Sequence, residues 1–496
     1  MNETEDRPRG GTGTRLERDS LGEREVPADV YYGIQTLRAL ENFPISGLKP
    51  HPGFIWATAV VKRAAAEANL ASGPLDPGIG RAIVQAAQEV IEGRWHDQFV
   101  VDVFQAGAGT SHNMNANEVL ANRAIEILGG HKGDYSLVHP NDHVNMSQST
   151  NDVFPTSMRL ASLSLLDRLY ASMEDLGQAL ESKGTEFSSV VKSGRTHLQD
   201  AVPVTLGQEF QAYARSVHKG QGRIQDAAQA LLTLNIGATA AGTGLNANAL
   251  YRPSVMERLK ALTGYDLRGA DDLMEATQST SDFAHVSSAL KAFVLDLIRI
   301  SNDLRLLGSG PRTGLGEINL PPVQPGSSIM PGKVNPVIAE VTDMVCFQVA
   351  GNDMTIAMAV QAGQLELNVM MPVIAFNLLQ SIEILKNVCA VLAGKCVRGI
   401  TANVERCREL AERSLGMATV LNPHIGYERA ASIAKEAQAT GRAVRDIVLE
   451  KGILSREDLE RILDPIRMAG PVASPPGVSG GVPLNSTKRR REMPSQ

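Results

Sequence analysis

The stretch that decides the fold is Gly326-Ser327-Ser328-Ile329-Met330-Pro331-Gly332-Lys333-Val334-Asn335-Pro336. Its two glycines allow a positive φ or a close approach of a ligand to the backbone, and prolines ahead of it mark a non-helical lead-in. Asn335 and Pro336 fit the N-cap and the first position of a helix that the apolar pattern predicts over 337–360. A loop that ends at the positive end of a helix, with Lys333 on its last turn, suits an anionic substrate.

Three interpretations of this loop compete. The first is a surface turn rich in Gly and Pro. The second is a phosphate-binding loop, but the spacing between Gly326 and Gly332 is one residue too long, and Val334 stands where Ser or Thr would hold magnesium. The third is a flexible catalytic loop over a carboxylate, in which Ser327 is the reactive group and backbone N–H donors surround it.

Composition favours a large helical protein. The chain has 496 residues, is rich in Ala and Leu, and has only 4% aromatic residues, which favours long helices over a β-sandwich. Its net charge of −6 argues against general nucleic-acid binding. We see no secretory signal and no uninterrupted apolar run of membrane-spanning length, and the four cysteines lack metal-ligand spacing, so we expect a cytoplasmic protein with unpaired thiols and no membrane partner.

Helical periodicity dominates the middle of the chain, where we expect helices over 153–180, 206–234, 253–262, 280–307, 337–360 and 371–392, after an earlier one over 117–127. Ser455-Arg456-Glu457-Asp458 predicts a further helix cap. The predicted helices are long, with few breaks, as in a helix bundle whose members continue into a neighbouring subunit. We expect a disordered tail over 1–14, an N-terminal domain over 15–148, a central helical-bundle domain over 149–402, a small C-terminal helical domain over 403–469, and a disordered tail over 470–496 that ends in a basic run.

Three further stretches place hydroxyls or amides where we expect helix starts. They are Gly107-Ala108-Gly109-Thr110-Ser111-His112-Asn113-Met114-Asn115, Ser147-Gln148-Ser149-Thr150-Asn151-Asp152, and Gly194-Arg195-Thr196-His197-Leu198-Gln199-Asp200, the last soon followed by a capping box at Thr205-x-x-Gln208. Singly, each is most simply a helix cap. If the fold brings them to the Ser327 loop, Arg195 and Lys333 would complete a polar pocket for two carboxylates.

These four stretches together resemble the substrate-contacting regions of the aspartase/fumarase superfamily, and the similarity runs from about Leu16 to Pro465. The resemblance implies a mainly all-α, three-domain fold, with a central long-helix bundle that forms the core of a homotetramer. It also implies composite sites built from different subunits, and reversible elimination across the Cα–Cβ bond of a succinyl group to release fumarate. It implies no cofactor, and the sequence shows neither a dinucleotide fingerprint nor a metal-ligand cluster.

Three features favour the aspartase branch over the fumarases. Gly107-Ala108-Gly109-Thr110-Ser111 is the aspartase-like version, Thr150 stands where fumarases usually have Ser, and Arg24-Glu25-Val26-Pro27-Ala28-Asp29-Val30-Tyr31-Tyr32-Gly33 is also aspartase-like. Met371 departs from both branches, because aspartases usually have Glu there and fumarases a basic residue. The resemblance therefore predicts aspartate ammonia-lyase activity, with L-aspartate, fumarate and ammonia as partners.

The resemblance also suggests roles for single residues. Ser327 would be the general base that takes a proton from Cβ. The resulting aci-carboxylate carries two negative charges, so preorganised donors should dominate catalysis. The β-carboxylate would be held by Thr110, Ser149, Thr150 and amides near Ser327 and Ser328. The α-carboxylate would be held by Lys333 and Asn335, with His197 as a second contact. The amino group would be held by Asn151 and Thr196. Glu340 would pair with His197, and Arg195 would position its loop.

Two alternatives belong to other classes of function. Fumarate hydratase would use the same loop and the same carboxylate pocket. A non-catalytic structural paralogue would keep the bundle and lose the chemistry, which the intact Ser327, Lys333, Asn335 and His197 argue against.

Overall fold

The structure is a computed structural model and describes residues 13–464. Helices make up most of this part and the strands are short, which confirms the predicted mainly α-helical class. The chain divides into two compact units. Of the described residues, unit 1 takes those up to Ala179, Tyr213–Leu306 and Leu320–Gly399, and unit 2 takes Leu180–Ala212, Leu307–Asn319 and those from Ile400 onward. The expected tails, 1–14 and 470–496, lie almost entirely outside the described residues.

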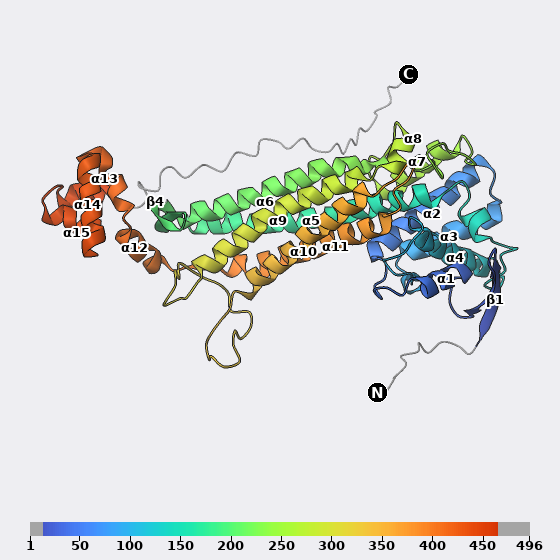
Figure 1. Cartoon of the computed structure of the whole chain (residues 1–496), viewed down its shortest axis with the longest axis horizontal. Coiled ribbons are helices and arrows are strands. Elements are labelled where there is room, and N and C mark those ends of the chain that lie inside the picture. Colours follow the sequence, from blue (N-terminus) through green and yellow to red (C-terminus); the bar gives the residue numbers. More distant parts are fainter. Residues whose placement is uncertain (1–12, 465–496) are drawn as a thin grey trace, which may run out of the picture. The chain divides into compact units, whose positions relative to one another are not determined.

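Long helices form the body of unit 1 (Figure 1). They are α5 (Thr150–Glu186), α6 (Leu206–Ala228), α9 (Ser281–Leu307), α10 (Val337–Gln361) and α11 (Met371–Lys395), all predicted from periodicity. Helices α5 and α6 also have several residues in unit 2. Polar pairs join neighbours: Arg159 on α5 with Asp282 on α9 (2.8 Å), Tyr213 on α6 with Asp303 on α9 (3.2 Å), and Arg305 on α9 with Asp343 on α10 (2.9 Å). The bundle is therefore held by specific contacts as well as by its apolar interior.

The segment Met371–Gly399 is apolar and long enough to cross a membrane, which the sequence analysis did not expect. Its hydropathy is high on average although polar residues interrupt it, and 56% of the most apolar window is buried inside the structure. Core helices of bundles have the same composition, because they bury apolar side chains on more than one face. We interpret α11 as such a core helix.

A smaller helical cluster in unit 1 consists of α2 (Pro52–Ser72), α3 (Pro77–Ile91) and α4 (Thr110–Ile127), which share one apolar core, and of α1 (Ile34–Asn42), which packs against α4. Local sequence explains two of the starts. His51 caps α2 by accepting from Gly53 N, and Asp76 caps α3 by accepting from two backbone N–H groups. In each helix a Pro follows the cap at the first helical position.

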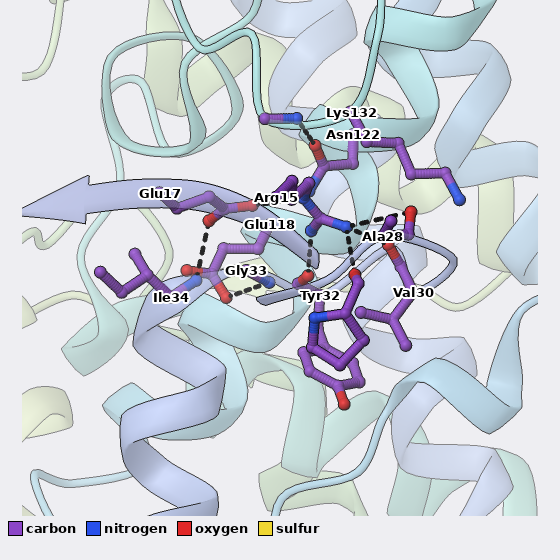
Figure 2. Close-up of polar contacts among 12 residues, drawn as sticks. Arg15, Glu17, Ala28, Val30, Tyr32, Gly33, Ile34, Glu118, Asn122 and Lys132 are labelled. Atoms are coloured by element: carbon purple, nitrogen blue, oxygen red, sulfur yellow. Dashed lines mark hydrogen bonds and ion pairs between the residues drawn. The ribbon is translucent and has the colours of Figure 1, made fainter. Parts of the chain in front are cut away.

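The N-terminal hairpin of β1 (Thr14–Asp19) and β2 (Gly22–Pro27) leads into a turn that Arg15 on β1 holds in shape and the buried Glu118 anchors to α4 (Figure 2). The Arg15 guanidinium donates to the carbonyls of Pro27, Val30 and Tyr32 at 2.6–2.8 Å. Glu118 on α4 accepts from Gly33 N, Gln35 N, Thr36 N and the Thr36 hydroxyl at 2.6–3.1 Å. The turn before α1 is thus fixed to the helix whose first residue is Thr110.

Unit 2 contains a β-hairpin and a set of short helices. The hairpin is β3 (Val191–Thr196) with β4 (Gln199–Thr205), and the helices are α12 (Val404–Arg413), α13 (Met417–Ile425), α14 (Tyr427–Thr440), α15 (Val444–Glu450) and α16 (Arg456–Ile462). Helices α13 to α16 surround a small apolar core. Both predicted caps in this unit are confirmed: Thr205 and Gln208 exchange bonds at 2.9 and 3.1 Å, and Ser455 Oγ accepts from Asp458 N at 3.0 Å.

The remaining elements are short. They are α7 (Tyr251–Thr263), α8 (Leu273–Gln278), the two-residue strands β5 (Thr233–Leu234), β6 (Arg268–Gly269), β7 (Ile318–Asn319) and β8 (Thr401–Ala402), and single helical turns at His96–Gln98, Pro140–Val144, Gln229–Leu232 and Val397–Gly399.

Candidate active site

The Ser327 loop is closed at its base by its own backbone. Gly326 N donates to Lys333 O at 2.9 Å, and Asn335 Nδ2 donates to Gly326 O at 2.6 Å. Gly332 has φ +81°, as its sequence position suggested, whereas Gly326 is required because a Cβ there would meet the carbonyl of Lys333. The loop is therefore a defined turn just before α10, with Lys333 exposed on it.

Ser327 is placed so that backbone amides face its oxygen. Its Oγ accepts from Ile329 N at 3.2 Å and from Met330 N at 3.0 Å. Two N–H donors favour the ionised form of an oxygen over the neutral form. Ser328, next to it, is exposed.

The start of α10 differs from the prediction. The helix begins at Val337, Pro336 precedes it, and no side chain caps it. Asn335, predicted as the N-cap, uses its amide to close the loop instead, because the carbonyl of Gly326 lies within reach. Val337 N donates to Asn335 O at 2.9 Å and Glu340 N to Pro336 O at 3.0 Å. The N–H groups of Ile338 and Ala339 have no side-chain acceptor within residues 13–464, which leaves these two available to an anion. Glu340 lies in this turn and is exposed.

A second group of predicted residues meets at the starts of α4 and α5. Thr110 is the first residue of α4 and Thr150 the first of α5, and their Oγ1 atoms lie 3.2 Å apart. Helix α4 was expected to begin near Asn117. It begins seven residues earlier, because Gly109 takes φ +93° and turns the chain directly into the helix. Two helix N-termini thus contribute hydroxyls to one place in unit 1.

Asn151 is oriented by a neighbouring loop. Its side-chain Nδ2 donates to Ala240 O at 2.7 Å, and its backbone carbonyl accepts from Asn235 Nδ2 at 3.1 Å. The next residue, Asp152, is fully buried and accepts from Ser149 N, Gly237 N and Thr239 N, each at 3.0 Å. Burial raises the pKa of Asp152 to about 6. These bonds fix the backbone of Ser149 and Asn151 and leave Oδ1 as the available atom of the Asn151 amide.

The stretch 194–200 does not start a helix, contrary to expectation. It forms the tip of the β3–β4 hairpin, and His197 and Leu198 occupy the two turn positions with φ +55° and +61°. A two-residue turn with both φ values positive usually needs Asn or Gly, because a side chain there costs about 1–2 kcal/mol. Thr196, His197 and Leu198 are all exposed. Strained residues of this kind concentrate at functional sites.

Arg195 reaches a buried carboxylate that sequence reasoning missed. Its Nη1 donates to both oxygens of Glu317 at 3.0 and 3.1 Å, and Lys192 Nζ lies 3.3 Å from the same carboxylate. The Glu317 side chain is 0% exposed. The only sequence signal was a single acid in a Gly-rich segment after α9. The pair ties the hairpin to the segment before β7, within unit 2.

Within a single chain, the Ser327 loop and the Thr110–Thr150 group lie near opposite ends of α11. Phe104, near the start of α4, contacts Phe376 in the first turns of α11, whereas Asn335 and Pro336 share a small cavity with Lys395 and Cys396 at its far end. The 25 residues of α11 span about 37 Å. Because the base of the loop is closed, Ser327 stays near the second end.

Other histidines in these stretches have structural partners. His112 is buried in α4, where its Nε2 lies 3.0 Å from the Thr58 hydroxyl, and burial lowers its pKa to about 3. His143 Nδ1 accepts from His139 N at 2.9 Å. Within residues 13–464, no group of three His, Cys, Asp or Glu side chains is arranged to hold a metal ion.

Comparisons with known proteins identify the family. A family model described as Lyase matches residues 22–351, and one described as Fumarase C C-terminus matches residues 417–470. The chain is 55% identical to the aspartate ammonia-lyase of Bacillus subtilis (strain 168), over 94% of this chain and 97% of that one. It is 52% identical to the aspartate ammonia-lyase of Pseudomonas aeruginosa, over 92% of this chain and 97% of that one.

Solved structures give the same result. A fumarate lyase:delta crystallin from Brucella melitensis, bound to cobalt, superposes with a TM-score of 0.91 at 51% identity, covering 92% of this chain and 100% of that one. A class II fumarase from Schistosoma mansoni gives 0.88 at 38% identity, with the same coverage. The family match covers most of the chain, and the relatives match nearly end to end. The chain belongs to the aspartase/fumarase superfamily.

Proposed function

We propose that this chain is an aspartate ammonia-lyase, a carbon–nitrogen lyase that reversibly eliminates ammonia from L-aspartate to give fumarate. The observation that carries this conclusion is the near end-to-end similarity, at 50–55% identity, to several proteins named aspartate ammonia-lyase. The class II fumarase structure is a more distant match, at 38% identity, so water release is the less supported alternative.

In the proposed mechanism, Ser327 removes a proton from Cβ. The amides of Ile329 and Met330, which already face its oxygen, would stabilise the alkoxide. The exposed cation of Lys333 lies on the same loop and adds to this effect. Closure of the loop over the substrate would exclude water and strengthen both interactions.

The charge that develops on the β-carboxylate would be held by Thr110, Ser149 and Thr150, together with loop amides near Ser328. The 3.2 Å separation of the Thr110 and Thr150 hydroxyls at two helix starts supports this role. Lys333 and Asn335, with His197, would hold the α-carboxylate. Asn335 already uses its Nδ2 on Gly326 O, so it would bind through its second amide hydrogen.

The leaving amino group would be held by Asn151 and Thr196. The bond from Asn151 Nδ2 to Ala240 O supports this assignment, because it leaves Oδ1 as an acceptor for an N–H donor. Arg195 would keep the His197 turn in place through Glu317, and Glu340 would pair with His197 in the assembled enzyme.

The separation along α11 supports assembly from several copies of the chain. The Ser327 loop and the Thr110–Thr150 group can complete a site only if different copies of the chain supply them, which supports the proposed homotetramer with composite sites. We also propose three domains, over 15–148, 149–402 and 403–469. The four cysteines are free and buried, which fits the proposed cytoplasmic location.

The activity is tested by following fumarate in the ultraviolet, with L-aspartate and L-malate offered separately. We expect fumarate from L-aspartate; turnover of malate with no turnover of aspartate would overturn the proposal in favour of a hydratase. For the base, Ser327→Ala should lower kcat by orders of magnitude while the oligomer and the circular dichroism spectrum stay unchanged. A loss of only a few fold would reduce Ser327 to a turn residue.

A further inference from the structure

A fully buried lysine lies beneath the Thr110–Thr150 group, and the mechanism above does not use it. Lys62 on α2 is 0% exposed, and its Nζ donates to Asn145 Oδ1 at 2.9 Å and to Gln148 Oε1 at 3.0 Å. Burial lowers the pKa of Lys62 to about 7, and the charge of Asp152 opposes that shift. In its charged form Lys62 only donates, so both amides then turn their oxygens toward it, as the structure shows.

The orientation of Asn145 is passed on to Asn113. The Asn145 Oδ1 that faces Lys62 also accepts from Asn113 Nδ2 and Asn117 Nδ2, each at 3.2 Å. Both of these residues must therefore present NH₂ groups to it. Their own Oδ1 atoms are buried without a partner within residues 13–464. An unpaired buried oxygen is unfavourable, so the surroundings, and not Asn113 itself, impose this orientation.

Asn113 in turn determines what Thr150 can do. The second hydrogen of Asn113 Nδ2 points to Thr150 Oγ1 at 3.2 Å. Thr110 Oγ1 also lies 3.2 Å from that oxygen, but its single proton has a nearer acceptor in Gly107 O at 2.7 Å. A hydroxyl has two acceptor sites and one proton. Asn113 therefore fills one acceptor site of Thr150 and, as a donor, cannot take its proton. Thr110 Oγ1, at 3.2 Å, is an acceptor within reach of that proton. A carboxylate is a stronger acceptor than a hydroxyl, so it can take the Thr150 proton from Thr110.

We propose that Lys62 is a positioning residue, which sets the direction of a hydrogen-bond chain through Asn145 and Asn113 so that Thr150 donates its proton to the substrate carboxylate. This inference rests on the proposed function, in which Thr150 contacts the β-carboxylate. If the hydrogen bonds from Lys62 to Thr150 ran in the opposite direction, Asn113 Oδ1 would accept the Thr150 proton. Thr150 would then present lone pairs to an anion, and one preorganised donor would be lost where charge develops.

The sharpest test is Asn113→Asp, which keeps the shape of the side chain and replaces its NH₂ donor with an acceptor. Loss of one such donor in an active site costs about 10²–10³ in kcat, so we expect kcat to fall at least tenfold with KM within about threefold. Lys62→Met should lower kcat about tenfold, because Asn145 keeps a second anchor, its Nδ2 bond to Gln148 O at 3.3 Å. Both are measured in the full-length oligomer with L-aspartate.

The matched control is Asn122→Asp, on the same helix. Asn122 (Figure 2) is 0% exposed, donates to Tyr31 O and accepts from Gly133 N, about three turns beyond Thr110 along α4. The Asn122→Asp variant introduces the same kind of buried carboxylate as Asn113→Asp, so it should lower thermal stability without changing kcat. A general structural effect of burying a charge would lower kcat in both variants, and that result would overturn the inference.

A double-mutant cycle with Thr150→Val shows whether the effect passes through Thr150. In the Thr150→Val background, Asn113→Asp should cause little further loss of kcat. A full additional loss of kcat would refute the inference that Asn113 acts through Thr150. If Asn113→Asp does not fold, Asn113→Ala removes the donor without adding charge and gives the same cycle. Inactivity of the wild type toward L-aspartate refutes the proposed function, whereas an active wild type with an unchanged Asn113→Asp variant refutes only this inference.

Discussion

The buried carboxylate of Glu317 allows a quantitative test of how the His197 turn is held. Glu317→Gln keeps the size of the side chain and removes its charge. In the native structure this carboxylate accepts two bonds from Arg195 Nη1, at 3.0 and 3.1 Å, and lies 3.3 Å from Lys192 Nζ. The change therefore removes the negative charge that Arg195 and Lys192 share.

The expected loss of stability follows from burial. Breaking a buried ion pair costs about 3–5 kcal/mol when the remaining charge has no other partner. Lys192 retains Glu209 at 2.7 Å, and the Arg195 side chain is 16% exposed. We therefore expect the lower end, about 3 kcal/mol. Because Arg195 precedes the turn, His197 should also bind substrate less well, which should raise KM about tenfold and leave kcat within about threefold.

The assay is urea unfolding at a fixed protein concentration, with kcat and KM for L-aspartate measured in parallel. Glu405→Gln is the control in the same unit, because Glu405 and Arg408 form an ion pair with side chains 75% and 63% exposed. Its stability should change by less than about 0.5 kcal/mol. If Glu317→Gln behaves like this control in both stability and KM, the reasoning about the hairpin is refuted.

Two further changes test the surroundings of Thr110. Burial raises the pKa of Glu118 from 4.5 to about 7. Between these two pH values the folded chain holds a proton on Glu118 that the unfolded chain has lost. The folded state therefore loses stability as pH rises from about 4.5 to about 7, by about 3 kcal/mol at most. Glu118→Gln should flatten that part of the dependence of Tm on pH, and an unchanged slope would contradict the shift. Gly109→Ala should destabilise by about 2–4 kcal/mol and lower kcat, because Gly109 has φ +93° and a Cβ would collide with the Phe154 ring. Gly222→Ala, with open space around it in α6, should be neutral or stabilising in the same thermal melt, and equal losses would refute the steric argument.

Features that depend on local sequence were predictable. The long helices, the Thr205–Gln208 capping box and the cap at Ser455 follow from periodicity and from residues a few positions apart, and the structure contains them. The turn at Gly332 also follows, because a positive φ there favours Gly.

Features that depend on distant partners were not predictable. Glu317 meets Arg195 across 122 positions of sequence, and Lys62 meets Asn145 across 83. Nothing near Lys62 distinguishes it from a lysine at the surface of a helix. Asn335 and the 194–200 stretch have sequences that fit helix starts, but tertiary contacts decided otherwise: a carbonyl within reach of Asn335, and strand pairing on both sides of His197. The residue roles themselves stay predictions until the variants are measured.

The length of α11 has a consequence for how such a protein can change during evolution. If neighbouring copies supply the missing half of each site, inserting or deleting a helical turn in the middle of α11 would shift every loop relative to the pocket it must meet, although no catalytic side chain had changed. Selection would then act on the spacing between the two ends of the bundle as strictly as on the residues of the site, and substitutions along the rod would be tolerated far more readily than changes in its length.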